Sequence, residues 1–265
     1  MESPKSLFDQ TKIMNMILDN RFVRSATYMG LANEDLTVSH RLIEGMVELA
    51  EGGVGLIITG LAAVTKNGTG IPQMLGIYDD SFIPGLAQLT EAVHKAGGKI
   101  MIQLAHSGAQ GNSQLTKEQL LGPSEIPAPS GEGLICRSMT VEDIKLIVKA
   151  FGEAGKRSKQ AGFDGIQLHG AHGYLISEFL SPYFNKRTDD YGGILENRAR
   201  FAFEVLQSVR DSVGSDYPVT IKINSEDLLE DGFTDIGLNA LHCLRNHRDS
   251  AVFLSHQDPA LAIDG

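Results

Sequence analysis

Short β-rich runs alternate with longer segments of helical period along most of this chain, and this alternation constrains its fold more than any other feature. Parallel strands joined by crossover helices produce such a pattern. Six runs predict strands, the last more weakly than the others: Phe22 to Ala26, Val54 to Thr59, Lys99 to Leu104, Asp164 to His169, Val219 to Asn224 and Ala251 to Leu254. Five segments predict helices: Ser39 to Ala50, Phe82 to Ala96, Val141 to Ala161, Leu195 to Val213 and Ile236 to Arg245.

Local signals support the predicted helix ends. Ser39, Ser81 and Thr140 are expected to cap helices, because their side-chain oxygens can accept hydrogen bonds from first-turn amides. The Gly97-Gly98 pair is expected to end a helix, since glycine tolerates the left-handed backbone common at that position. The stretch from Ala105 to Ser138 is rich in Gly, Pro and Ser, which predicts a long functional loop.

The composition indicates one ordinary globular domain. The 265 residues, 42% of them apolar, are enough for a large core, and this length is compatible with a full α/β barrel. No repeat or change of composition divides the chain, so residues 1–265 are predicted to form a single domain.

Charge and cysteine content argue against several classes of protein. The net charge is −10, so neither nucleic acid nor an anionic membrane is an expected partner. Apolar runs are too short to cross a bilayer, and the N-terminus does not have the pattern of a secretory signal. Cys136 and Cys243 lie far apart, which fits neither a disulfide framework nor a zinc site. We therefore expect a cytoplasmic protein.

Three polar side chains stand at or just after the end of the fourth predicted strand: His169, His172 and Tyr174. Two imidazoles can donate hydrogen bonds to one carbonyl oxygen and stabilise the enolate that forms when hydride adds to a conjugated C=C. A phenol beside them could supply the proton. Two other interpretations stay open: ordinary hydrogen-bonded histidines at a strand end, and metal ligands of a barrel hydrolase. No third metal ligand stands at a useful spacing, so no metal is expected.

Several segments in a fixed order resemble the Old Yellow Enzyme family of FMN-dependent oxidoreductases, over about residues 5 to 235. The matching segments are Leu7-Phe8, Asn20 to Thr27, Gln103 to Gly108, His169 to Tyr174, Glu178 to Pro182, Arg187 to Gly193 and Glu196-Asn197-Arg198. The resemblance implies a TIM, or (β/α)8, barrel. It also implies a reaction in which NAD(P)H reduces FMN and hydride then passes to an α,β-unsaturated carbonyl compound, with ping-pong kinetics.

The resemblance assigns roles to individual residues. His169 and His172 would hold the substrate carbonyl or the nicotinamide amide, and Tyr174 would protonate the α-carbon. Gln103 would bond the pyrimidine edge of FMN, and Lys222 would lie near flavin N1 and the C2 carbonyl. The remaining cofactor-binding candidates line the isoalloxazine: Ser25, Ala26, Thr27 and Gly60.

Simpler roles remain for some of these residues. Gln103 could cap a strand edge, and Lys222 could be a surface cation. The segment from Arg187 to Arg198 is predicted to be structural, with Asp189, Asp190 and Arg198 bracing a turn at Gly192-Gly193. Cys136 is predicted to be an ordinary loop thiol, and Thr27-Tyr28 stand where some relatives carry a redox-tuning cysteine.

Beyond about Thr234 the similarity fades, so residues 236–265 are interpreted as a divergent tail. About six strands of the barrel are then expected, without the last strand-helix units and their FMN phosphate site. An alternative function follows: an inactive truncated barrel that no longer holds FMN. The substrate, the choice between NADH and NADPH, and homo-oligomerisation are left open.

Overall fold

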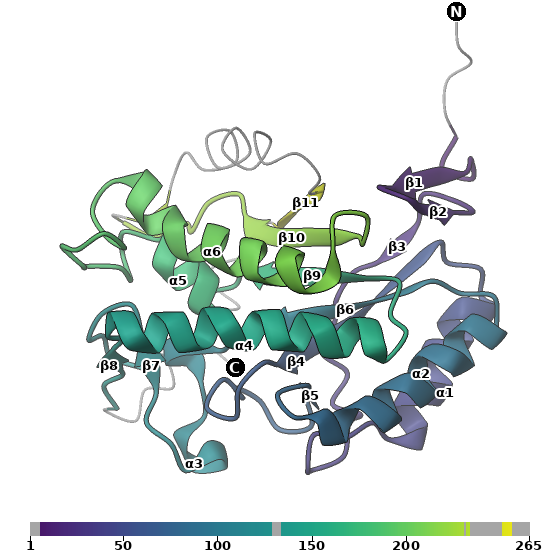
Figure 1. Cartoon of the computed structure of the whole chain (residues 1–265), viewed down its shortest axis with the longest axis horizontal. Coiled ribbons are helices and arrows are strands. Elements are labelled where there is room, and N and C mark those ends of the chain that lie inside the picture. The colour runs from purple at the N-terminus through teal and green to yellow at the C-terminus, as the bar shows by residue number, and fades with distance from the viewer. Residues whose placement is uncertain (1–5, 129–133, 231, 234–250, 256–265) are drawn as a thin grey trace, which may run out of the picture.

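A curved parallel sheet forms the centre of the computed structural model, which describes residues 6–128, 134–230, 232–233 and, by backbone alone, 251–255 (Figure 1). All strands within this sheet pair in parallel, and β5 (Leu75–Gly76) pairs with β4 beside the main path. The path runs β11 (Ala251–Ser255), β10 (Val219–Asn224), β9 (Gly165–Gly170), β6 (Ile100–Ala105), β4 (Leu56–Ala63) and β3 (Val23–Arg24). The predicted set of six strands is confirmed, and the sheet is part of an α/β barrel.

Within the described residues, four long helices connect the strands and cover the outer face of the sheet (Figure 1). They are α1 (His40–Glu51), α2 (Ile83–Lys95), α4 (Val141–Gln160) and α6 (Leu195–Val213). Shorter turns of helix are η1 (Asp80–Phe82), η2 (Gly108–Gln110), α3 (Ser113–Thr116) and α5 (Leu175–Leu180). The helix predicted from Ile236 to Arg245 lies outside the described residues.

Two of the three predicted caps are confirmed. The Ser39 side chain accepts from the Leu42 amide, and Thr140 forms a reciprocal capping box with Asp143. The prediction for Ser81 is wrong, because Asp79 caps the preceding turn η1 by accepting from the Ser81 amide. Gly97, with φ of +82°, follows the end of α2 as predicted.

The inner and outer faces of the sheet differ in polarity. Alternate residues of a strand point to opposite faces, so Ile57, Ile102 and Leu168 pack outward in the core shared with the helices. On the inner face, Leu56, Ile58 and Met101 form a separate apolar cluster near the amino ends of the strands. Polar side chains replace apolar ones toward the carboxyl ends, where a barrel carries its ligand site.

A short hairpin covers the apolar end of the inner face. Its strands, β1 (Thr11–Ile13) and β2 (Met16–Leu18), pair antiparallel, and Met16 and Leu18 pack on the inner apolar cluster. The predicted long loop after β6 contains two further short strands, β7 (Leu121–Gly122) and β8 (Arg137–Ser138). The amino end of the half-barrel is therefore closed by apolar contacts, while its loops gather at the carboxyl end.

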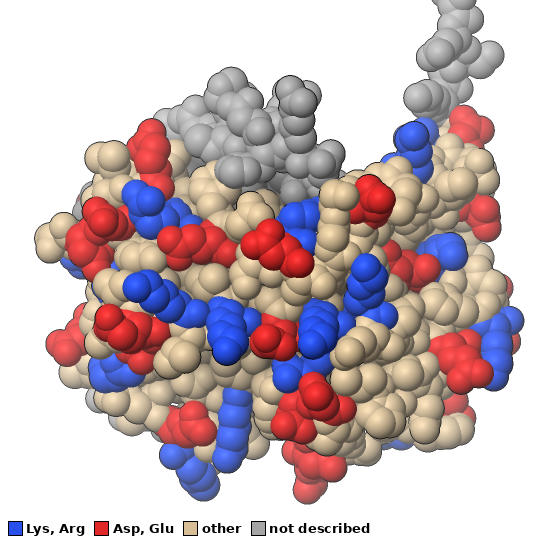
Figure 2. Space-filling view, in the orientation of Figure 1, with Lys and Arg blue, Asp and Glu red and all other residues tan. Residues whose placement is uncertain are grey.

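Figure 2 shows the helical side of the molecule, where Lys and Arg lie among Asp and Glu over α4 and α6. Charges of both signs are thus interspersed on this face. Among the described residues, no helix is long and apolar enough to cross a membrane.

Candidate functional site

A patch of polar side chains crosses three neighbouring strands on the inner face. Gln103 of β6 lies beside Gln167 of β9, and His169 of β9 lies beside Lys222 of β10. Gln167 and His169 are two residues apart, so both point to the same face. The four groups therefore form one patch at the carboxyl end of the sheet, which we call the strand-end site.

Gln103 and Lys222 lie inside the sheet. They therefore do not have the alternative roles considered from sequence, a strand-edge cap for Gln103 and a surface cation for Lys222. Gln103 is 1% exposed, and its Nε2 donates to Oε1 of Gln167 at 2.7 Å. Its backbone amide donates to Oγ1 of Thr59. Lys222 is half-buried between β9 and β11, and burial lowers the pKa of its ammonium. Neither residue is at a sheet edge or on the outer surface.

The structure brings the three catalytic candidates together. The His169 ring lies edge to face with both partners, with centroids 5.0 Å from His172 and 4.7 Å from Tyr174. His169 is the penultimate residue of β9, His172 follows in the turn, and Tyr174 occupies the N-cap position of α5. One strand-to-helix turn therefore presents two imidazoles and a phenol beside Lys222, and from here on the strand-end site includes His172 and Tyr174.

Burial keeps all three groups uncharged at neutral pH. It lowers the pKa of His169 well below the ordinary value, with smaller contributions from His172 and Lys222. Burial, followed by the charge of Lys222, lowers the pKa of His172 to about 4. Burial raises the pKa of the Tyr174 phenol. The imidazoles are therefore neutral N–H donors, and the phenol retains its proton.

His172 has a left-handed backbone, with φ of 60°, which is uncommon for a residue other than glycine. Two side chains hold this turn from opposite sides. The His172 amide donates to Oδ1 of Asn224 at 3.0 Å, and its carbonyl accepts from Nε2 of Gln110 at 2.8 Å. Asn224 ends β10 and Gln110 ends η2, so the end of a neighbouring strand and the loop after β6 together fix this turn.

The segment after β3 lies against β4. Gly60 comes so close that a Cβ there would stand 3.0 Å from the carbonyl oxygen of Thr27. Nη1 of Arg24 donates to the Ser25 and Thr27 carbonyls, which shapes the segment that also contains Ala26. These candidates lie across β4 and β6 from the histidines, at the same end of the sheet.

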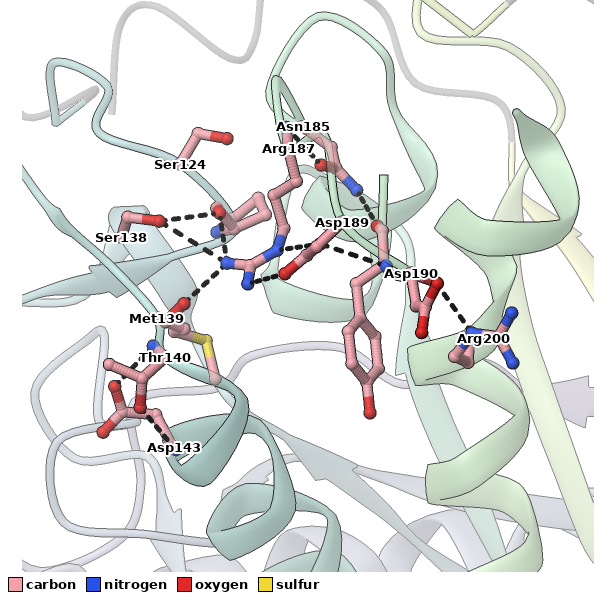
Figure 3. A network of polar contacts seen from close by, with 12 residues as sticks. Ser124, Ser138, Met139, Thr140, Asp143, Asn185, Arg187, Asp189, Asp190 and Arg200 are labelled. Atoms are coloured by element: carbon pink, nitrogen blue, oxygen red, sulfur yellow. Dashed lines mark hydrogen bonds and ion pairs between the residues drawn. The ribbon is translucent and has the colours of Figure 1, made fainter. Parts of the chain in front are cut away.

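The segment from 187 to 198 has the structural role predicted for it (Figure 3). Nη1 of Arg187 donates to the carbonyls of Pro123 and Met139, and Nη2 pairs with Asp189 at 2.5 Å. We call these four residues the Arg187 clamp. Arg198 donates to the carbonyls of Leu180 and Gly193, whereas Asp190 contributes its backbone carbonyl, which accepts from Arg200.

Other candidate chemistry finds little support. Cys136 is buried, its thiol donates to the Ser124 carbonyl, and burial raises its pKa. Cys243 lies outside the described residues. Within the described ranges, no group of three or more His, Cys, Asp or Glu side chains could hold a metal ion.

A hollow of about 690 Å³ lies at the opposite end of the sheet, lined in part by Asn15, Lys99, Lys159, Asp164 and Tyr217. It is flanked by the amino ends of β6, β9 and β10, so it is remote from the histidines. The strand-end site is identified by its imidazoles, phenol and ammonium group, and not by the volume of a hollow.

Gln167, Asn224 and Gln110 were not predicted as site residues. For Gln167 a signal existed, because it is a polar residue two positions before His169 in an otherwise apolar strand. Asn224 and Gln110 reach His172 across 52 and 62 residues of sequence, respectively. Such contacts depend on how the loops pack, and no local sequence pattern predicts them.

A half-barrel of parallel strands with buried donors at their carboxyl ends defines an α/β-barrel protein with its ligand site at the usual edge. Comparison with known proteins narrows this class. The chain belongs to the NADH:flavin oxidoreductase / NADH oxidase family, whose model matches residues 6–258. The predicted resemblance to Old Yellow Enzymes is confirmed, and the family match extends beyond the residues on which that resemblance was based.

Two curated relatives and one solved structure illustrate the similarity. The chain is 41% identical over 231 residues to an NADH oxidase of Thermoanaerobacter brockii, covering 86% of this chain and 35% of that protein. It is 40% identical over 234 residues to a cinnamate reductase of Clostridium sporogenes, with the same two coverages. An Old Yellow Enzyme homologue from Zymomonas mobilis superposes with a TM-score of 0.87 at 28% identity, covering 95% of this chain and 74% of that one. The chain thus spans about a third of the length of these curated relatives.

Proposed function

We propose that this chain is the FMN-binding barrel domain of an oxidoreductase that reduces the activated C=C of α,β-unsaturated carbonyl compounds with NAD(P)H. The observation that carries the proposal is the strand-end site, where two neutral imidazoles, a protonated phenol and a half-buried cation share one end of the sheet. Family membership supports FMN as the cofactor and NAD(P)H as the reductant.

The residues present fit the ring system of FMN. The paired amides of Gln103 and Gln167 offer a donor and an acceptor for a pyrimidine edge, and Lys222 supplies positive charge on the neighbouring strand. The backbone of Thr27 packs on Gly60, which forms a wall without a protruding side chain. We assign Ser25, Ala26, Thr27, Gly60, Gln103 and Lys222 to cofactor binding.

When bound, FMN supplies the hydride-transfer chemistry between NAD(P)H and the β-carbon of a conjugated alkene. His169 and His172 donate hydrogen bonds to the carbonyl oxygen of the substrate and stabilise negative charge on it. Their low pKa values keep them neutral, so they donate without giving up a full proton. Tyr174 holds its proton at neutral pH and delivers it to the α-carbon.

The proposed substrate class is an enone, enal or related conjugated carbonyl compound. The cinnamate reductase relative carries the name of a compound of this general kind. A small molecule is the expected partner, and the cytoplasm, where NAD(P)H is available, is the proposed location. Reductant and substrate take turns at the same imidazoles, which predicts ping-pong kinetics.

The visible absorption spectrum of the purified chain tests this proposal. The protein is incubated with FMN, free dye is removed, and an NAD(P)H solution followed by an enone is added without oxygen. Retained flavin that bleaches with NAD(P)H and recovers with the enone is the expected result. A folded but colourless protein would sink the proposal and favour the inactive barrel.

A further inference from the structure

Glu178 is a buried acid without an evident catalytic role. It lies on α5, it is completely buried, and burial raises the pKa of its carboxyl well above the ordinary value. The groups that oppose this shift are the backbone amides of Ala109 and Gln110. Oε1 accepts from the Ala109 amide at 2.8 Å, whereas Oε2 has no hydrogen-bond partner within the described structure. Burial therefore favours the neutral form of the carboxyl, and its contacts are with a loop.

The loop that Glu178 contacts is the turn η2. Gly108, the first residue of this turn, has φ of +62°, and a Cβ there would stand 2.4 Å from Oε2 of Glu178. The turn is thus seated directly on the carboxyl, with a close approach that only glycine permits. The position of η2 consequently depends on where Glu178 places its oxygens.

The last residue of η2 is Gln110, which reaches the turn that carries His172. Its Nε2 donates to the His172 carbonyl, and a Cβ on Gly173 would stand 2.2 Å from the same nitrogen. The amide of Gln110 therefore fills the space beside the left-handed residue and supplies one of its two backbone hydrogen bonds. A strained backbone of this kind persists only when its surroundings hold it.

We propose that Glu178 and Gln110 are positioning residues that act through η2 to fix the left-handed turn of His172 and thereby aim its imidazole. The inference rests on the proposed role of His172 at the strand-end site. Glu178 also donates its backbone amide to the Tyr174 carbonyl at 2.8 Å, so the same helix start carries the phenol. The carboxyl that seats η2 and the phenol of Tyr174 therefore stand on the same short helix.

The test compares Gln110→Glu, Glu178→Gln and Glu178→Leu in the full chain. Gln110→Glu keeps the size of the side chain and removes the donor to His172. Glu178→Gln carries no charge and keeps an oxygen that can accept from the Ala109 amide, whereas Glu178→Leu removes this acceptor. Gln88→Glu and Glu153→Gln, both on exposed helix faces, are the matched controls. Glu178→Asp, which withdraws the carboxyl by one methylene, replaces the leucine variant if that variant does not fold.

Two readouts separate positioning from general stability. The first is the NMR signal of the His172 ring in histidine-labelled protein, assigned by its loss in His172→Asn and recorded with and without FMN. The second is kcat/KM for an enone. We expect Gln110→Glu and Glu178→Leu to shift the His172 signal and to lower kcat/KM roughly 10- to 100-fold, the scale of a misplaced catalytic group. Glu178→Gln and the controls should match wild type in both readouts. The double variant that combines Gln110→Glu with Glu178→Leu should have a kcat/KM no lower than that of the poorer single variant.

Two outcomes would overturn the inference: a His172 signal in Gln110→Glu that matches Gln88→Glu, or independent, additive effects of Gln110→Glu and Glu178→Leu. If wild type binds no flavin and shows no turnover, the proposed function fails, but the NMR signal of the flavin-free protein still decides the positioning role.

Discussion

The strand-end site and the Arg187 clamp are both polar, and both lie among the loops at the carboxyl end of the sheet. They differ in how their charges are satisfied. In the clamp, a guanidinium that is 9% exposed meets a carboxylate and two carbonyls, and Arg187 is the first cause of the lowered pKa of Asp189. At the strand-end site, the imidazoles owe their lowered pKa values mainly to burial and then to other imidazole or ammonium groups.

The cause of a pKa shift therefore separates the two roles better than its size does. A carboxylate stabilised by an internal cation has its interactions satisfied within the chain, which indicates structure. An imidazole kept neutral by burial remains a donor suited to an uncharged carbonyl oxygen, which indicates function. Substitutions in the two regions should consequently affect different measurements.

The largest effect is expected for His169→Leu, which keeps the side-chain volume and removes the donor. Loss of one hydrogen-bond donor to a developing oxyanion lowers kcat roughly 10²- to 10³-fold. Steady-state kinetics with NAD(P)H and an enone measure the change. His40→Leu, at a histidine that is 83% exposed, is the control. Activity of His169→Leu within the range of that control would remove His169 from the catalytic set.

Arg187→Ala should act on stability and leave kcat of the folded protein unchanged. Removing the guanidinium leaves the carbonyls of Pro123 and Met139 without their charged donor, whereas the 40%-exposed carboxylate of Asp189 stays in contact with water. This loss costs about 2 kcal/mol, or roughly 4–8 °C in Tm for a chain of this size. Thermal unfolding measures the shift, with Arg41→Ala on the exposed face of α1 as control. A stable variant with impaired turnover would contradict the division between the two regions.

A pH series should separate the strand-end site from a structural ion pair, that of Asp143 with Arg137, within one protein. Between the ordinary histidine value of 6.5 and the folded value of about 4 for His172, the unfolded chain binds more protons. Stability is therefore complete above pH 6.5 and falls as pH decreases, by up to about 1.4 kcal/mol per pH unit for each such histidine. The lowered pKa of Asp143, about 2, places the loss from its pair with Arg137 at more acidic pH, below 3.8.

Urea unfolding of wild type and His172→Asn between pH 7 and pH 4 tests this prediction. The free energy of unfolding should fall less steeply with decreasing pH in the variant than in wild type. Glu178, whose raised pKa changes stability in the opposite direction, is present in both proteins, so its contribution cancels in the comparison. Equal slopes would show that His172 is not held neutral in the folded chain.

Lys222→Met should have the smallest effect. Loss of positive charge near the flavin disfavours its anionic reduced form, and about 1.4 kcal/mol corresponds to roughly 30 mV for a two-electron couple. Spectroelectrochemical titration should therefore give a more negative midpoint potential than in wild type. Lys149→Met, on the exposed side of α4, should leave the potential unchanged. An unchanged potential in Lys222→Met would exclude Lys222 as an electrostatic partner of the flavin.

Much of the fold was predictable because strands and helices have local periods. The strand Val219–Asn224 was predicted to the residue, since its ends are marked by a proline and a polar segment. For β4, the sequence predicted an end at Thr59, but the strand runs from Leu56 to Ala63. An irregularity in register between Ile58 and Leu61 lets the strand continue past Gly60, and such irregularities depend on the neighbouring strand.

The candidate site was predictable where chemistry is local in sequence. His169, His172 and Tyr174 fall within six residues, and strand period placed them near a sheet end. The amide pair of Gln103 and Gln167 joins residues 64 positions apart, so it required the pairing of β6 with β9. The raised pKa of Glu178 also depends on complete burial, which a sequence of mixed polarity does not reveal.

The left-handed turn at His172 also restricts how this position can vary over evolution. Asn, Asp and Gly adopt this backbone region readily, whereas most other residues cost about 1–2 kcal/mol there. A lineage that acquires a new substrate would therefore sample few side chains at position 172. Tyr174, with an extended backbone at φ of −79° and ψ of 173°, has no such restriction. Two neighbouring residues that we propose to contact the same ligand can then diverge at unequal rates for reasons that lie in the main chain.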